Sequence, residues 1–288
     1  MAFTKPATLP NCSGPNPLNR LLELRAPLEW ASLALSAPYL LTAPKGDGRQ
    51  VLLLPGYMAA DNSMRPLELY LNHLGYSAKA WGLGTNRGDV EGDIIRFGNV
   101  VERLSDQHGG EGITLIGWSL GGIYARELAR ARPDLVRQVI TLGSPIQMIE
   151  NDTSSASRMW DSLSKYHAKG FRSPEREADR PLLQVPTTSI YSRTDGVVNW
   201  KACLIRKTDR SENIRVFGSH CGLGFNAAAI YAMADRLAQP AGQWQHFSAP
   251  WYLRSAFPCA TDLDRSKPRF SHPGSGVDPA RQTRRRRQ

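Results

Sequence analysis

Residues 115–122 read Leu115-Ile116-Gly117-Trp118-Ser119-Leu120-Gly121-Gly122. This stretch closes an apolar run typical of a buried strand and opens an amphipathic helix. A serine between two glycines at such a junction lies in a tight strand-to-helix turn that lifts its hydroxyl clear of the sheet. Side chains at positions 117 and 121 would collide with neighbouring backbone in so sharp a bend. The pattern predicts a nucleophile at Ser119, beside helix amides that favour negative charge. The alternative is a glycine-rich turn with an idle serine.

Strands and helices alternate on both sides of this stretch. Residues 51–54 are all apolar, as expected for a strand buried on both faces of a parallel sheet. Alternation of this kind predicts an α/β fold with a mostly parallel sheet flanked by helices. The expected strands are 51–54, 76–81, 113–116, 136–142, 187–191 and 214–217, and the expected helices are 67–74, 92–105, 120–131 and 227–237.

The expected core covers residues 21–146 and 187–250, preceded by a loose, Pro- and Asn-rich segment at 1–20. Residues 147–186 are polar and Ser-rich, and 40 residues exceed a plain connection within a compact domain. We therefore expect a lid or cap insertion there, with a simple surface excursion as the alternative. Residues 258–288 are rich in Pro, Ser, Asp and Arg, which predicts a disordered basic tail.

The chain has 288 residues, with 36 Lys and Arg against 26 Asp and Glu, and a net charge of +10. From residue 251 onward nine Lys and Arg face three Asp, so +6 of this charge lies in the tail. We therefore expect no nucleic-acid partner, and the run 284–287 fits either an anionic partner or a solvated chain end. No stretch approaches the roughly 18 apolar residues of a membrane span, and no apolar signal region is evident, so the expected location is cytoplasmic. Nothing in the sequence indicates an oligomeric state.

The sequence resembles the α/β-hydrolase superfamily, and within it the bacterial serine esterases and lipases, over about residues 48–240. The likeness is carried by the stretches Leu54-Pro55-Gly56-Tyr57, Gly117-Trp118-Ser119-Leu120-Gly121-Gly122, Thr141-Leu142-Gly143-Ser144-Pro145, Tyr191-Ser192-Arg193-Thr194-Asp195-Gly196 and Gly218-Ser219-His220-Cys221-Gly222. The resemblance implies the α/β-hydrolase fold and a catalytic triad in the chain order serine, acid, histidine.

A base must take the proton of Ser119 before its oxygen can attack. Among the six histidines, at 73, 108, 167, 220, 246 and 272, only His220 directly follows a late expected strand and lies among small residues. Asp195 follows the strand 187–191 at the same edge of the sheet, where it would orient the imidazole. A turn role in the Asp-Gly pair is the alternative for Asp195. Glu150, after the preceding strand, is the reserve acid.

Stabilising a tetrahedral oxyanion requires two preorganised donors. The first expected donor is the backbone N–H of Leu120. By resemblance the second is the N–H of Tyr57, with Met58 as the alternative, in a loop where Pro55-Gly56-Tyr57-Met58 replaces the His-Gly common in lipases. Met58 and Trp118 adjoin the reacting groups, as Tyr57 does, and are candidates for the substrate pocket.

Four cysteines, at 12, 203, 221 and 259, lack metal-binding spacing, and the chemistry requires no metal or organic cofactor. Cys203 and Cys221 lie near the expected acid and base in sequence, and either a disulfide or two free thiols fits this spacing.

These residues predict a serine hydrolase that cleaves carboxylic esters through an acyl-enzyme, with a small-molecule ester or lipid-like substrate. Thioesterase, lactonase, amidase and acyltransferase reactions share the acyl-serine and stay open. A non-catalytic binding protein on the same scaffold is the alternative from another class.

Overall fold

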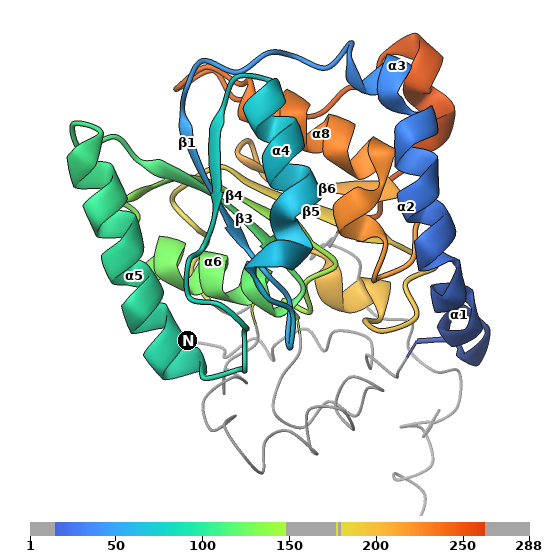
Figure 1. Cartoon of the computed structure of the whole chain (residues 1–288), viewed down its shortest axis with the longest axis horizontal. Coiled ribbons are helices and arrows are strands. Elements are labelled where there is room, and N and C mark those ends of the chain that lie inside the picture. Colours follow the sequence, from blue (N-terminus) through green and yellow to red (C-terminus); the bar gives the residue numbers. More distant parts are fainter. Residues whose placement is uncertain (1–14, 148–176, 178–179, 263–288) are drawn as a thin grey trace, which may run out of the picture.

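A single parallel sheet forms the centre of the protein. The computed structural model describes residues 15–147, 177 and 180–262 (Figure 1). The strands are β1 (Gln50–Leu54), β2 (Ser77–Ala80), β3 (Ile113–Trp118), β4 (Val136–Leu142), β5 (Thr187–Ser192) and β6 (Ser211–Val216). They pair in the order β2-β1-β3-β4-β5-β6, and every pairing is parallel. The predicted α/β class and each of the expected strands are confirmed.

Helices cover both faces of this sheet. Those expected from the sequence are present as α4 (Arg65–His73), α5 (Val90–Gln107), α6 (Leu120–Ala131) and α8 (Ala227–Leu237). Alternate residues of β1 bury on opposite faces, as the two-residue period of a strand requires. Leu52 and Leu54 pack in one core with Phe97 of α5, whereas Leu53 packs in the other with Leu71 of α4. The helices α5 and α6 therefore lie on one face, with α4 and α8 on the other.

Three further helices precede the sheet and follow one another along one side of the molecule (Figure 1). They are α1 (Pro17–Leu22), α2 (Ala26–Leu35) and α3 (Ala37–Leu40). Pro17, Pro27 and Pro38 each lie in a first helical turn, where the missing N–H costs no hydrogen bond. Each of these prolines therefore lies where a helix begins. Residues 17–20, expected in a loose segment, are helical, and Asn16 caps them by accepting from Leu18 N–H at 3.0 Å.

Short 3₁₀ turns occupy residues Glu23–Arg25, Asp61–Met64, Trp200–Cys203, Leu223–Phe225 and Trp251–Ala256. The first residues of the expected tail pack on the core, because Thr261 N–H donates to the Tyr191 hydroxyl at 2.8 Å. Glu177, near the end of the expected lid, pairs with Arg126 and Arg130 of α6. The remainder of the expected lid, at 148–176 and 178–179, lies outside the described residues, as do 1–14 and 263–288.

The strand order reverses direction at a defined point of the sheet. From β1 the chain moves outward to β2 and then returns to the other side of β1 as β3. Ligands of open α/β sheets bind beyond the carboxyl ends of the strands where the order reverses in this way. The loops after β1 and β3 contain Tyr57 and Ser119, so two of the predicted site residues lie at this reversal. None of the described helices is long and apolar enough to cross a membrane.

Candidate active site

Ser119 lies in a strained turn between β3 and α6. Its backbone has φ 52° and ψ −118°, a region that side chains other than glycine rarely adopt. A β-carbon at Gly117 would overlap the carbonyl carbon of Gly121, and one at Gly121 would overlap the carbonyl oxygen of Leu54. Neither position has room for a side chain, because the turn brings its backbone segments too close together, as inferred from the sequence. The Ser119 side chain is partly exposed at the end of the buried strand β3.

Asp195 and His220 form a buried hydrogen-bonded pair beyond β5 and β6. His220 Nδ1 donates to Asp195 Oδ2 at 2.7 Å, and the two side chains are 8% and 1% exposed. The other carboxylate oxygen, Oδ1, accepts the N–H groups of Val197 at 2.8 Å and Val198 at 2.7 Å. With its proton on Nδ1, the imidazole keeps the lone pair of Nε2 available as a base.

The structure brings Ser119 and His220 to the same edge of the sheet without a direct hydrogen bond between them in the described part of the chain. Trp118, the preceding residue, donates its indole N–H to the carbonyl oxygen of His220 at 3.1 Å. The Ser119 N–H donates to the carbonyl oxygen of Leu142 at 2.8 Å. Gly143, which follows Leu142, lies against the imidazole, since a β-carbon at Gly143 would be 3.1 Å from His220 Nδ1. Catalytic hydrogen bonds are often long before substrate binds and tighten in the complex.

The charges around His220 favour its protonated form. Burial alone would lower the pKa of His220, but the Asp195 charge and hydrogen bond, together with the Glu23 charge, outweigh it and raise this pKa above its ordinary value of 6.5. A carboxylate that stabilises the imidazolium is what a general base needs once it has accepted a proton.

The two predicted oxyanion donors flank the nucleophile. Leu120 is the first residue of α6, and its N–H has no acceptor among the residues that the structure describes. The loop after β1 approaches from the other side, since a β-carbon at Gly56 would lie 3.3 Å from Ser119 Cβ. Tyr57 follows Gly56 directly. The N–H of Met58, the alternative donor, donates to Asn86 O at 2.7 Å.

Asn86 is a buried residue of this loop system that the sequence did not indicate. Its Nδ2 donates to Pro55 O at 2.9 Å, and its Oδ1 accepts from Gly88 N–H at 3.1 Å and from the Tyr124 hydroxyl at 3.2 Å. Asn86 thereby ties the loop after β1 to the loop before α5 and to α6. The only local signal was its position in a polar stretch that follows β2.

The two candidate pocket residues differ in exposure. Met58 is 61% exposed and has φ 56°, so it stands at the surface of the loop after β1. Trp118 is only 9% exposed and packs edge-on against Phe225, with ring centroids 6.3 Å apart. The indole of Trp118 therefore supports the His220 loop from beneath.

Two other histidines of the sequence analysis bond backbone carbonyl oxygens elsewhere in the described structure. The ring of His108 bonds the carbonyl oxygen of Leu104, and that of His246 bonds the carbonyl oxygen of Thr208. Cys203 is buried and Cys221 exposed, and no disulfide joins them, so the disulfide alternative is not realised. Glu150 lies outside the described residues. No cluster of three or more metal-ligating side chains occurs in the part of the chain that the structure describes.

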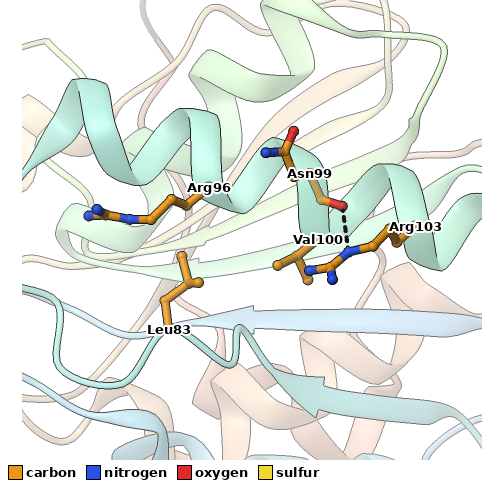
Figure 2. A pocket seen from close by; sticks show the side chains of 5 residues that line it. All are labelled: Leu83, Arg96, Asn99, Val100 and Arg103. Atoms are coloured by element: carbon orange, nitrogen blue, oxygen red, sulfur yellow. Dashed lines mark hydrogen bonds between the residues drawn. The ribbon is translucent and has the colours of Figure 1, made fainter.

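A separate hollow of about 440 Å³ lies along α5 (Figure 2). Its lining consists of Leu83, Arg96, Asn99, Val100 and Arg103. Both arginines already have partners: Arg96 pairs with Asp89 and Asp93, and Arg103 Nε donates to Asn99 O at 3.2 Å. None of the residues proposed for catalysis lines this hollow.

Comparison with known proteins agrees with the fold. The sequence profile of a family described as alpha/beta hydrolase fold matches residues 54–195. Among solved structures the chain is similar to an alpha/beta hydrolase enzyme from the metagenome of sediments of the lagoon of Mar Chica, Morocco, with 17% identity, coverage of 66% of this chain and 90% of that one, and a TM-score of 0.47.

Two further solved structures are similar at the same level. One is a lipase-esterase related protein from Clostridium acetobutylicum, with 16% identity, coverage of 67% of this chain and 96% of that chain, and a TM-score of 0.48. The other is a monoacylglycerol lipase from Paleococcus ferrophilus, with 16% identity, coverage of 67% of this chain and 96% of that chain, and a TM-score of 0.44. No curated protein matches the chain.

Proposed function

This chain belongs to the α/β-hydrolase superfamily, and we propose that it is a serine hydrolase that cleaves carboxylic esters. The observation that carries the proposal is the buried Asp195–His220 hydrogen bond of 2.7 Å at the sheet edge where Ser119 occupies its strained turn. Backbone strain of this kind persists where the surrounding structure enforces it, and it clusters at functional sites.

The proposed reaction passes through an acyl-enzyme. His220 Nε2 removes the hydroxyl proton of Ser119 as Oγ attacks the ester carbonyl, and the alkoxide leaves with that proton. Water then attacks the acyl-serine, with His220 again as the base, and the acid is released as Ser119 regains its proton. Asp195 holds the imidazole in the required tautomer and stabilises the imidazolium.

The backbone N–H groups of Leu120 and Tyr57 are the proposed donors to the oxyanion. Leu120 begins α6, whose dipole also favours negative charge at this end. The Asn86 bond to Pro55 O holds the other loop in place, so the donors are positioned before the charge develops. Preorganisation of this kind supplies much of the rate enhancement in acyl transfer.

Turnover of p-nitrophenyl esters and labelling by a fluorophosphonate test the proposal. We expect Ser119→Ala to abolish labelling and to lower kcat by about 10⁶-fold, because a triad acts as a unit. The matched control is Ser63→Ala, whose hydroxyl bonds only the carbonyl oxygen of Ala60 in the 3₁₀ turn before α4. Labelling that persists in Ser119→Ala would refute the assignment.

The substrate class within acyl transfer is decided by a second panel. Esters from acetate to palmitate, with matched thioesters and lactones, distinguish an ester hydrolase from a thioesterase or a lactonase, since all three pass through the same acyl-serine. We expect carboxylic esters to give the highest kcat/KM. A small-molecule ester or lipid-like compound is the proposed partner.

A further inference from the structure

We propose that Glu23 is a positioning residue of this site, its carboxylate joining the loop that carries Asp195 to the loop that carries His220. The inference rests on the proposed function for its catalytic consequence. It concerns a residue of the N-terminal helices, which lie outside both the matched family range and the parallel sheet.

The hydrogen bonds of Glu23 reach both loops at once. Its Oε1 accepts from Gly196 N–H at 2.7 Å and from His220 N–H at 2.7 Å. Its Oε2 accepts from Cys221 N–H at 3.0 Å. One carboxylate thus accepts hydrogen bonds from the backbone of His220, the proposed base, and of Gly196, which follows the proposed acid Asp195. Hydrogen bonds to an ionised acceptor are about twice as strong as neutral ones.

Glu29, two turns further along, supports the same contact. It accepts from Ser219 N–H at 2.9 Å and from the Ser219 hydroxyl at 2.8 Å. Arg25 donates to Glu29 at 2.7 Å and to the Thr194 hydroxyl at 2.6 Å. The charge of Glu29 is therefore balanced by Arg25, whereas Glu23 has no cationic partner within the described ranges.

A glycine in each of the two loops leaves room for the contact with the N-terminal helices. A β-carbon at Gly196 would overlap the carbonyl oxygen of Asn19 and lie 2.8 Å from Glu23 Cγ, and one at Gly222 would overlap the carboxylate of Glu29. A glycine directly after Asp195 and another shortly after His220 thus let the N-terminal helices approach.

The charge of Glu23 has a second effect that a purely mechanical link would lack. Together with Asp195 it raises the pKa of His220 against the opposing effect of burial. An uncompensated carboxylate beside the imidazole stabilises the imidazolium that forms when Ser119 is deprotonated. Position and charge can therefore be tested separately.

Two substitutions separate them. Glu23→Gln keeps the length and one oxygen acceptor but removes the charge, whereas Glu23→Asp keeps the charge and shortens the reach. The pKa of His220 is measured by NMR titration of its ring protons in Ser119→Ala protein, and kcat and KM are measured in proteins that retain Ser119. Glu102→Gln, an exposed residue of α5 paired with Arg132, is the control for loss of a carboxylate elsewhere.

We expect Glu23→Gln to lower the pKa of His220 and to reduce kcat by about tenfold with little change in KM, because loss of the charge destabilises the imidazolium and weakens hydrogen bonds to an ionised acceptor. Glu23→Asp should leave the pKa nearer to that of the unsubstituted protein while kcat still falls. Glu102→Gln should change neither. An unchanged pKa and an unchanged kcat in Glu23→Gln would overturn the proposal.

Hydrogen exchange in the unsubstituted protein covers the case in which a variant does not fold. The amides of Gly196, His220 and Cys221 should be protected, and free exchange at all three would contradict the link. The NMR and exchange measurements need no turnover. If no ester is hydrolysed, the proposed function fails, while these measurements still decide whether Glu23 acts on His220.

Discussion

Asp195 uses its two carboxylate oxygens for different tasks. Oδ1 accepts two backbone N–H groups and fixes the turn, while Oδ2 accepts from His220. The turn contacts and the contact with His220, which belong to the two alternatives that the sequence left open, are therefore made by one side chain. A residue held from one oxygen presents the other in a fixed direction, which is what an acid that only orients a base requires.

We predict that Asp195→Asn lowers kcat by about 10⁴-fold, because an amide favours the wrong imidazole tautomer while leaving the geometry intact. Ester turnover at saturating substrate measures the effect. Asp209→Asn, an exposed residue before β6, is the matched control and should leave kcat unchanged. A loss of less than tenfold in Asp195→Asn would count against Asp195 as the acid.

The raised pKa of His220 predicts the pH profile of kcat/KM. The free enzyme needs a neutral imidazole, so activity rises as pH increases through the pKa of His220. Since Asp195 and Glu23 raise this pKa against burial, the midpoint of the acid limb should lie above the ordinary histidine value of 6.5. A profile of kcat/KM from pH 5 to pH 9 measures the midpoint. A midpoint below 6.5 would contradict this assignment.

At the scale of elements, the loop after β1 is held by neighbours that are distant in the sequence. Asn86 forms a side-chain bond to Pro55 and accepts the Met58 N–H through its own carbonyl oxygen. Tyr124 of α6 bonds Asn86 in turn. The position of the proposed Tyr57 donor therefore depends on an amide from the segment between β2 and α5.

We expect Asn86→Asp to lower kcat by about 10²- to 10³-fold, the size of effect that follows loss of an oxyanion donor. Aspartate keeps the acceptor for Gly88 but places a carboxylate oxygen against the carbonyl of Pro55, which displaces the loop. Steady-state kinetics and near-UV circular dichroism measure activity and folding together. Asn99→Asp, exposed on α5, serves as the control, and equal activity of the two variants would refute the role of Asn86.

The sheet could be predicted because its signal is local. The central strands β1 and β3 are marked by apolar runs, and residues 115–122 mark the junction of β3 and α6 without any tertiary information. Parallel strands then bring their carboxyl ends to one edge, which is why Ser119, Asp195 and His220 could be selected from residue order alone.

The support of the site could not be predicted in this way. The bonds of Glu23 and Asn86 join segments whose sequences carry no mark of each other, and a glutamate in a leucine-rich helix resembles any solvent-facing residue. The leucines of that helix also gave no guide, since Leu24, Leu28 and Leu35 are exposed. Contacts between distant segments follow from the complete fold.

At the scale of the whole molecule, a buried ion pair fastens α8 to the sheet. Arg236 of α8 donates to Glu212 of β6 at 2.8 Å, and their side chains are 2% and 6% exposed. The second oxygen of Glu212 accepts from Phe247 N–H at 2.8 Å, so the segment after α8 is held as well. Removing one member of such a pair leaves an uncompensated buried charge.

We predict that Arg236→Met lowers the free energy of unfolding by about 3–5 kcal/mol, and that adding Glu212→Leu recovers much of this loss. Urea unfolding at pH 7, followed by tryptophan fluorescence, measures both variants. Arg132→Met, which breaks an exposed pair with Asp134, should leave the unfolding midpoint unchanged. A double variant no more stable than Arg236→Met would show that the charge is not the cause.

The bond between Glu23 and His220 spans 197 positions of the chain. During synthesis the N-terminal helices leave the ribosome long before the segment that they must hold, and the nucleophile is also made well ahead of its base. A nascent chain that ends before residue 220 therefore contains an inert serine. The proposed site is therefore assembled only after residue 220 has been made, when the helices that begin at Pro17 can meet the loop that carries His220.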